Sequence, residues 1–154
     1  PKRGQIALFH VPVNTSVNYV KRVIGVPGDS ISYVNKVFYI NGKKLTQKYL
    51  GPGYEDNPGA SPTKVKIYQE NLLGVKHRIL INPNRPSIDF YNLKVPKGDY
   101  FMIGDNRDDS DDSRYWGFVP EKDFIGQALW VWMSWDSNAN WAHKIRWSRM
   151  GTEL

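Results

Sequence analysis

Hydrophobic and polar residues alternate along most of this chain in short runs, which is the pattern of β-strands rather than of helices. The runs are rich in β-branched and aromatic residues and are bounded by turn-forming Gly, Pro, Asn and Asp. They predict strands at Ile6–Val11, Tyr19–Val26, Ser30–Tyr33, Lys36–Ile40, Val65–Gln69, Lys76–Ile81, Tyr100–Ile103 and Gln127–Met133. The pattern therefore predicts a mostly β fold, in which coiled antiparallel sheets surround a barrel-like core.

Three connections between these runs have recognisable signals. The dipeptide Asn41-Gly42 predicts a hairpin turn, with Lys43–Thr46 as the returning strand. Pro120–Phe124 predicts one short turn of helix. Gly51–Pro62 is rich in Gly, Pro, Asn and Ser, so we expect a mobile loop there.

The composition describes a chain that can fold around a core of its own. Hydrophobic residues make up 40% of its 154 residues. No stretch reaches the ~20 apolar residues that a membrane span needs, and no signal peptide is visible. There is no cysteine, which excludes disulfides and thiolate metal sites, and the three histidines show no ligand spacing. We expect neither a metal nor a cofactor.

An unusually polar segment, Gly104–Arg114, lies between two apolar stretches. Seven of its eleven residues are ionisable. Acids at short spacing suggest a calcium loop, but counting from Asp105 puts Arg107 at the third ligand position, and counting from Asp108 puts Ser113 where a glycine belongs. A solvated loop is the plainer interpretation. The alternative is a polar network held at the edge of the core, as chemistry often requires.

A second segment favours that alternative. Asn18–Asp29 reads as a strand that ends in a Pro-Gly-Asp turn, and Lys21 and Arg22 interrupt its apolar run. Side chains alternate along a strand, so these two cations must face opposite ways and one of them points inward. Burial favours the neutral form of a lysine amine, and a neutral amine is a general base.

Together these segments resemble a known family. Lys21–Asp29, Gly104–Arg107 and Ser110–Arg114 resemble blocks of the type I signal peptidases, above all those of Gram-negative bacteria. Arg3–Phe9 and Phe124–Ala128 are similar to two further blocks. The likeness runs from about Arg3 to Met150 and is weak between Ser30 and Val95.

The resemblance implies a membrane-bound serine endopeptidase with a Ser–Lys dyad, which removes signal peptides from exported preproteins after small residues. It would lie at the bacterial inner membrane with its catalytic region on the periplasmic face. Lys21 matches the general base, and Ser110 matches the hydroxyl that holds the lysine amine in place. Residues that match supporting positions are Arg22, Asp105, Asp112, Ser113 and Arg114. Residues that would line the substrate cleft, where an extended peptide adds as a strand, are Leu8, Asn18, Tyr19 and Val20.

The family's nucleophilic serine lies upstream of the block that Arg3–Phe9 resembles, as do its oxyanion donors and membrane anchors. Because the chain as given begins at Pro1, we expect these parts to lie outside it and the chain alone to be inactive. Ser16 is expected to be a loop serine between two strands rather than a substitute nucleophile. The resemblance also divides the chain into a catalytic core, 1–29 and 96–154, and an inserted β domain, 30–95.

Two acidic residues depart from the family pattern. Asp109 stands where the family usually has Asn, and Asp111 fills a variable position near the expected lysine. An ionised carboxylate close to Lys21 favours the ammonium, which is the wrong form for a base. We therefore expect Asp109 and Asp111 to point to solvent, or the site to compensate for them.

The net charge of +6 calls for an anionic partner. The basic cluster Lys144–Arg149 lies near four tryptophans, a combination that suits a phospholipid membrane surface. These tryptophans are Trp130, Trp132, Trp135 and Trp141. Some of them could equally be core residues of a strand. Nucleic acid is the weaker interpretation, because no nucleic-acid-binding motif accompanies the aromatics.

Two other functions stay open on the sequence. One is a related Ser–Lys protease, such as a self-cleaving repressor or a pilus-processing protein, although these lack so long a Gly-Asp-Asn-Arg block. The other is a non-enzymatic β domain at the membrane surface, whose acidic network is structural.

Overall fold

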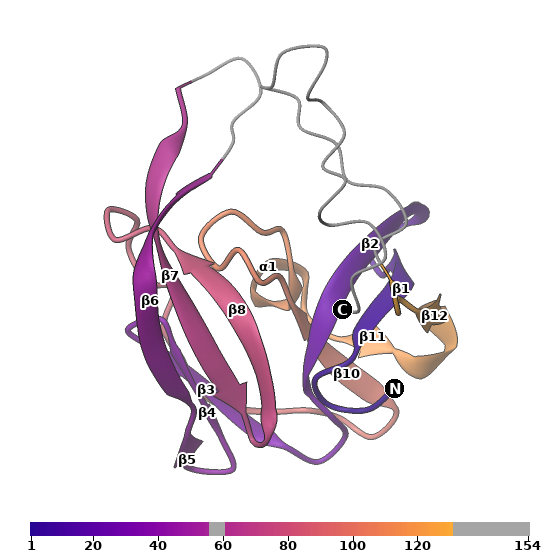
Figure 1. Ribbon diagram of the computed structural model, residues 1–154. Coiled ribbons are helices and arrows are strands. Elements are labelled where there is room, and N and C mark those ends of the chain that lie inside the picture. The colour runs from indigo at the N-terminus through magenta and orange to yellow at the C-terminus, as the bar shows by residue number, and fades with distance from the viewer. Residues whose placement is uncertain (56–60, 131–154) are drawn as a thin grey trace.

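The structure is a computed structural model that describes residues 1–55 and 61–130. Its described strands form three antiparallel sheets, and its helices are short, so the expected mostly β architecture is confirmed (Figure 1). The short helices are α1 (Ser113–Trp116) and the single 3₁₀ turn η1 (Glu121–Asp123). The latter is the helical turn expected after Pro120. No helix among the described residues is long and apolar enough to span a membrane.

The five-stranded sheet carries the segments singled out from the sequence. In spatial order its strands are β11 (Val119–Pro120), β10 (Asp99–Ile103), β2 (Asn14–Gly25), β1 (Ile6–Val11) and β12 (Phe124–Gln127). Its central strand is β2, on which Lys21 lies opposite Ala7, and Arg22 lies opposite both Ile6 and Ile103. Arg22 is therefore held by a neighbouring strand on both sides, and Lys21 by β1 on one side.

Two smaller sheets are built from the middle of the chain. The four-stranded sheet is β5 (Lys43–Lys44), β4 (Val37–Ile40), β3 (Ser30–Val34) and β9 (Phe90–Lys94). The three-stranded sheet is β6 (Thr46–Glu55), β7 (Thr63–Leu72) and β8 (Val75–Ile81). The predicted Asn41-Gly42 turn is confirmed, with φ of 52° and 78° at its two residues, the left-handed values that a two-residue hairpin requires.

Three details of the sequence interpretation are wrong. Gly51–Glu55 belongs to strand β6 rather than to a loop, because each residue from Gly51 to Glu55 pairs with β7. Pro52 is tolerated because β6 is an edge strand. On the side of β6 that has no neighbouring strand, a residue without an N–H removes no hydrogen bond. Strand β12 begins at Phe124 and ends at Gln127, near the start of its partner β1. Ala128 and Leu129, which were predicted to belong to this strand, therefore lie outside it. Residues 131–133 lie outside the described part of the chain.

The position of Ser16 is the third correction. Strand β2 begins at Asn14, and only Pro12 and Val13 connect it to β1. Ser16 is therefore a strand residue and not a loop residue, because pairing of β1 with β2 continues almost to the hairpin tip. It is exposed, and its backbone N–H donates to Asn14 Oδ1 at 3.2 Å.

Buried residues on the two faces of the central sheet pack into separate clusters. Val23 packs with Phe9 and Met102, whereas the adjacent Ile24 packs with Phe101 and with residues of β3, β4 and β7. Full burial of one such side chain stabilises the fold by roughly 1.5–3 kcal/mol. The second cluster joins residues 24, 101 and 103 to the segment 30–95, so the two parts of the proposed division share a core. The division itself stays a prediction.

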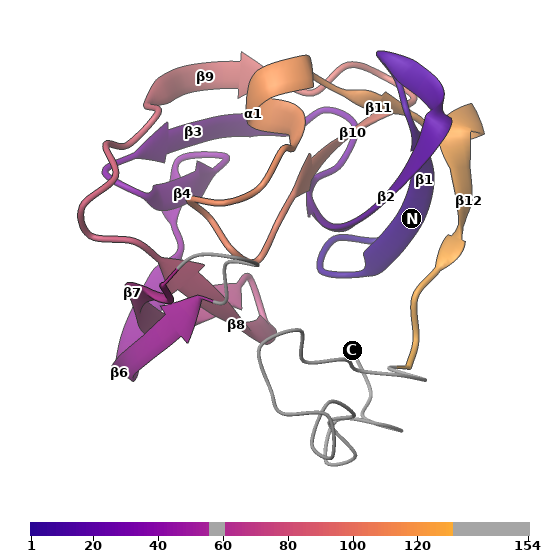
Figure 2. The same ribbon diagram turned by 90° about the horizontal axis from the view of Figure 1, so that it is seen from above.

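The polar segment between β10 and α1 runs between the central sheet and the three-stranded sheet, beside β8 (Figures 1 and 2). Leu80 donates its backbone N–H to Asp105 O, and Arg107 donates its own to Leu80 O, each at 2.9 Å. Backbone hydrogen bonds alone thus fix this segment against β8.

Candidate active site

The Lys21 side chain meets Ser110 across 89 residues of sequence. Lys21 Nζ lies 2.7 Å from Ser110 Oγ, and both residues are only partly exposed. Lys21 projects from the central strand, and Ser110 lies on the segment before α1. The structure therefore brings together the two residues to which the sequence assigned a base and its hydroxyl partner.

Burial changes the acidity of this amine. Desolvation is the largest influence on Lys21 and lowers its pKa below the ordinary 10.5, with the Arg114 charge acting in the same direction. The carboxylates of Asp112, Asp111 and Asp109 oppose this shift without reversing it. The Tyr19 ring, whose centroid lies 5.2 Å from Lys21 Nζ, covers the amine on one side. The site thus favours the neutral amine more than water does.

The two unusual acids lie at the surface. Asp111 accepts a hydrogen bond from the Tyr19 hydroxyl at 2.8 Å, which raises the pKa of Tyr19. Asp109 is exposed, and its Oδ1 lies 3.8 Å from Arg85 Nη1. Both residues are exposed, so water screens their charges in part, although both still raise the pKa of Lys21.

A buried ion pair supports the Ser110 segment from within. Asp112 is fully buried, accepts from Arg114 Nε and Nη2 at 2.8 Å each, and also accepts from the backbone N–H of Gly104 at 3.1 Å. Ser113 Oγ accepts from the backbone N–H of Met102 at 2.8 Å. The residues that follow Ser110 are therefore tied to β10 and to Gly104.

A second ion pair lies on the opposite face of the central strand. Arg22 donates to both carboxylate oxygens of Asp105, at 2.9 and 2.8 Å, and to Gly4 O at 2.7 Å. Such a bidentate pair fixes orientation as well as charge. The alternation of a strand therefore directs Lys21 to Ser110 and its neighbour Arg22 to Asp105.

A third buried pair was not identified from the sequence. Glu70 of β7 has 0% of its surface exposed and binds both terminal nitrogens of Arg107, while Gln47 donates to it at 3.0 Å and His77 Nε2 lies 3.4 Å away. Burial raises the pKa of Glu70, but the Arg107 charge and the hydrogen bonds from Arg107, His77 and Gln47 together outweigh burial and hold this pKa at about 2. The sequence signal for this pair was Glu70 itself, a glutamate at a position that strand alternation makes buried. Its partner Arg107 lies 37 residues away, so the sequence did not show the pairing.

A further contact joins the segment to the rest of the chain. Asp108 accepts from Lys36 Nζ at 2.8 Å and from the backbone N–H of Asn82 at 2.7 Å. Lys36 has a left-handed backbone, with φ of 65°. Residues 105, 107 and 108 thus each bond to a different part of the chain.

The residues predicted to bind substrate do not share one face of the sheet. Cross-strand partners point the same way, so Tyr19 lies on the face of Lys21, together with Phe9. Leu8, Asn18 and Val20 lie on the other face, and Val20 is 53% exposed. Their contact with a substrate stays a prediction.

Two other expectations concern residues near the C-terminal end. Trp130 is 60% exposed, whereas Trp132, Trp135, Trp141 and the basic cluster Lys144–Arg149 lie outside the described residues.

In the described part of the chain, no group of three or more His, Asp and Glu side chains could hold a metal ion.

Comparison with known proteins gives a consistent result. Residues 1–135 match the family described as signal peptidase, peptidase S26. The signal peptidase I of Pseudomonas fluorescens is 40% identical over 163 residues, covering 98% of this chain and 55% of that protein. The enzyme of that name from Pseudomonas aeruginosa is 40% identical over 147 residues, covering 88% of this chain and 50% of that protein. The chain thus spans about half the length of these relatives.

A solved structure agrees with these relatives. A crystal structure of a signal peptidase I from Enterococcus faecalis V583 is 31% identical, covers 83% of this chain and 96% of that chain, and superposes with a TM-score of 0.54. The resemblance expected from the sequence blocks is thereby confirmed.

Proposed function

The chain belongs to the signal peptidase family, peptidase S26, and on this premise we propose that it forms the base-bearing part of a serine endopeptidase that removes signal peptides from exported preproteins. The observation that carries the proposal is the 2.7 Å contact of a half-buried Lys21 amine with Ser110 Oγ. Burial also lowers the pKa of this amine, as a general base requires.

In the proposed reaction, Lys21 acts as the general base of a Ser–Lys dyad. Its neutral amine takes the proton from a serine hydroxyl while that oxygen attacks the scissile carbonyl. The resulting ammonium then gives the proton to the departing amine of the mature protein, which leaves an acyl-enzyme ester. Water, deprotonated by the same amine, hydrolyses the ester and restores the serine.

Ser110 has a positioning role in this proposal. Its hydroxyl oxygen accepts from the lysine amine, and its own position depends on the Asp112–Arg114 pair and on Gly104. The Arg22–Asp105 pair fixes strand β2, which carries Lys21, from the face opposite the lysine side chain. These supporting ion pairs do not exchange protons with the substrate.

We propose that the nucleophilic serine comes from the segment that, in the family, precedes the block that Arg3–Phe9 resembles. We also propose that this chain alone does not cleave peptides. Among the serines of the described residues, Ser110 alone has a hydrogen bond to Lys21. Ser16 lies on the same strand five residues away, about 16 Å at strand spacing. Ser113 already accepts a backbone N–H.

The proposed substrate is an extended peptide that adds as a strand beside β1 and β2, near Leu8, Asn18, Tyr19 and Val20. The proposed location is the bacterial inner membrane, with this region on the periplasmic face and its tryptophan-rich end at the phospholipid surface. Exposed Leu129 and Trp130 support that orientation, because apolar side chains at a membrane surface leave water.

A chimera tests the proposal. The half of the Pseudomonas fluorescens signal peptidase I that matches this chain is replaced by residues 1–154, and cleavage of a purified preprotein is followed by gel electrophoresis. We expect cleavage, and we expect Lys21→Ala to abolish it. Lys76→Ala, which removes an exposed lysine on β8, is the matched control and should cleave normally.

Two outcomes would count against the proposal. A folded chimera that leaves preproteins intact would favour a non-enzymatic β domain. Cleavage that survives Lys21→Ala would remove the lysine from the mechanism. The isolated chain, assayed in parallel, should show no cleavage.

A further inference from the structure

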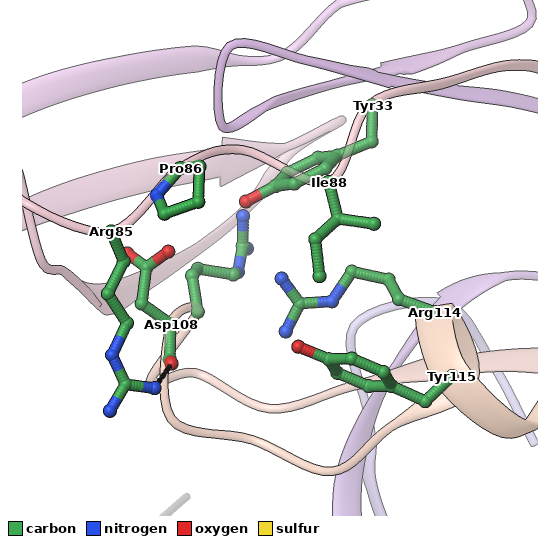
Figure 3. Close-up of a pocket in the computed structure, with 8 residues that line it drawn as sticks. Tyr33, Arg85, Pro86, Ile88, Asp108, Arg114 and Tyr115 are labelled. Carbon is green, nitrogen blue, oxygen red and sulfur yellow. Dashed lines mark hydrogen bonds between the residues drawn. The ribbon is translucent and has the colours of Figure 1, made fainter.

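A small cavity lies beside the Ser110 segment, and Lys21 is not among the residues that line it. Its volume is about 140 Å³, roughly ten times the ~10–15 Å³ that one water molecule requires. Its polar lining is formed by Tyr33, Arg85, Arg107, Asp108, Arg114 and Tyr115. Figure 3 shows Arg114 and Tyr115 facing Arg85 and Asp108 across this space, with Tyr33 at its upper side.

Two buried residues of the lining, Tyr33 and Arg107, have donors without a hydrogen-bond partner. Tyr33 is only 1% exposed, and its hydroxyl has no hydrogen-bond partner among the described residues. Arg107 Nε also has no hydrogen-bond partner among the described residues, because Glu70 binds only the two terminal nitrogens of that guanidinium. Burial raises the pKa of Tyr33, so its hydroxyl keeps its proton. An unsatisfied buried polar group is costly, which suggests an occupant that the protein chain does not supply.

The walls add further donors. Asp112 binds Nε and Nη2 of Arg114, which leaves the other terminal nitrogen for a ligand. The Arg114 guanidinium lies between two aromatic rings, with its Cζ 5.5 Å from the Tyr33 centroid and 6.0 Å from the Tyr115 centroid. Arg85, whose side chain is 55% exposed, stands at the mouth and donates through Nη1 to Asp108 O.

Acceptors are scarce in the same lining. The Asp108 carboxylate is already engaged by Lys36 Nζ and by the Asn82 N–H. Asp109, 3.8 Å from Arg85 Nη1, is as exposed as that arginine, and such surface pairs are weak. Three guanidinium groups and two phenols line a space whose one carboxylate, that of Asp108, is engaged. Glu70 and Asp112, which pair with Arg107 and Arg114, are not among the lining residues, so those two arginines turn only their remaining N–H groups to the cavity. The ligand that fits is an acceptor with negative charge.

From this imbalance we infer that the cavity is a binding site for a phosphate group, either inorganic phosphate or the terminal phosphate of a lipid headgroup. Donors from Tyr33, Arg114 and Arg85 lie on different sides of the space, which suits a tetrahedral oxyanion better than a planar carboxylate. This site goes beyond the proposed peptidase function and uses neither Lys21 nor a substrate peptide.

Occupancy would also affect the neighbouring site. Asp108, Arg114 and Tyr115 flank Ser110 in sequence, and Arg85, Asp108 and Tyr115 also line the open depression that contains Ser110. A phosphate bridging Arg85 and Arg114 would hold the segment 108–115 against the β8–β9 connection. Phosphate binding would therefore stabilise the arrangement that positions Ser110.

The test measures binding of inorganic phosphate to the 154-residue chain by calorimetry and by ³¹P NMR, with sodium chloride at matched ionic strength as the blank. We expect saturable binding at one site. Arg85→Ala should weaken it roughly tenfold to hundredfold, since it removes a charged hydrogen-bond donor. Arg78→Ala removes an exposed arginine from β8 and should leave the affinity unchanged.

Tyr33→Phe gives a second, independent arm. Its hydroxyl has no protein partner, so the variant should fold with a melting temperature equal to or above that of the original chain. We expect about tenfold weaker phosphate binding. If Tyr33→Phe were nevertheless poorly folded, Tyr115→Phe, which removes an exposed hydroxyl at the mouth, would take its place.

A vesicle arm distinguishes the two sources of phosphate. Phosphatidylcholine vesicles containing phosphatidic acid are sedimented with the chain and with Arg85→Ala and Arg78→Ala. If the chain co-sediments with the vesicles and Arg85→Ala, but not Arg78→Ala, weakens this co-sedimentation, the ligand is a lipid headgroup. If the chain binds inorganic phosphate but does not co-sediment with the vesicles, the ligand is the free ion. The inference is wrong if phosphate shows no saturable binding, or if Arg78→Ala weakens binding as much as Arg85→Ala. Loss of peptidase activity in the chimera would not affect this result.

Discussion

Ser110 lies directly against the bare Cα of Gly104. A Cβ built on Gly104 would stand 2.1 Å from Ser110 Oγ and 2.6 Å from Ser110 Cβ, distances that no real contact allows. The same Cβ would be 3.5 Å from Lys21 Nζ. The lysine–serine contact therefore depends on the absence of a side chain at a third residue.

Gly104→Ala is predicted to separate Ser110 from Lys21. Forcing a methyl group into this space should cost about 1–3 kcal/mol of stability and lengthen the 2.7 Å contact. A crystal structure of the variant, together with its activity in the chimera, measures both effects. Gly126→Ala is the control, because a Cβ there meets no atom within 4 Å. An unchanged contact and full activity in Gly104→Ala would contradict the prediction.

The Lys21 amine is predicted to titrate below its ordinary pKa of 10.5, because burial lowers that pKa. Between the lowered value and 10.5 the unfolded chain binds more protons at this site than the folded chain, so this group makes stability rise with pH in that window. NMR of ¹³C-labelled lysine measures the midpoint directly. A midpoint at or above 10.5 would show that burial does not lower the pKa of this amine.

Asp111→Asn should lower the pKa of Lys21 further, because the Asp111 charge raises it. In the chimera, the rise of activity with pH should then move to lower pH, since the base is neutral at a lower pH. Asp123→Asn removes a carboxylate from η1 that is not among the charges acting on Lys21, and should leave the profile in place. A shift toward higher pH in Asp111→Asn would be the opposite of what this electrostatic argument requires.

The Glu70–Arg107 pair predicts a loss of stability in acid. The folded pKa of Glu70, about 2, lies below the ordinary 4.5, so its contribution is complete above pH 4.5 and is lost as the pH falls through 2. The difference corresponds to about 3 kcal/mol. Urea unfolding at a series of pH values measures it. Asp29 also has a lowered pKa, so the comparison with Glu70→Gln isolates the Glu70 contribution.

Glu70→Gln should lower stability by about 3–5 kcal/mol at neutral pH, because it leaves the Arg107 charge buried without a partner. Its stability should then depend less on pH between 4.5 and 2. Equal acid sensitivity in the original chain and in Glu70→Gln would assign the effect to other carboxylates.

Arg22→Lys should be destabilising by about 1–3 kcal/mol although it keeps the charge. A lysine cannot reproduce the two parallel bonds to Asp105 together with the bond to Gly4 O. A double-mutant cycle with Asp105→Asn in urea unfolding gives the coupling energy. Arg78→Lys, an exposed exchange on β8, should be neutral. A coupling energy near zero would mean that the pair does not hold the lysine strand.

Much of the local structure could be predicted because it depends on neighbours in sequence. Period-two alternation predicted most of the strands and the mostly β fold, and Asn-Gly chemistry predicted the turn at Asn41. The same alternation required Lys21 and Arg22 to face opposite ways, as they do. Where pairing with a distant strand decided the outcome, local composition misled: Gly51–Glu55 has the residues of a loop but pairs with β7. Likewise, Ser16 lies within strand β2, whose pairing with β1 extends to Asn14.

The sequence by itself determined which residue types stand near one another along the chain, and its blocks identified the family. The tertiary structure alone decided the distances: the approach of Ser110 to Lys21 over Gly104, the pairing of Glu70 with Arg107, and the unpartnered Tyr33 hydroxyl in a cavity of donors. The physical reason is range. Strand and turn preferences arise from neighbouring residues, whereas burial, pKa shifts and ion pairs depend on groups that only the packing of three sheets brings together.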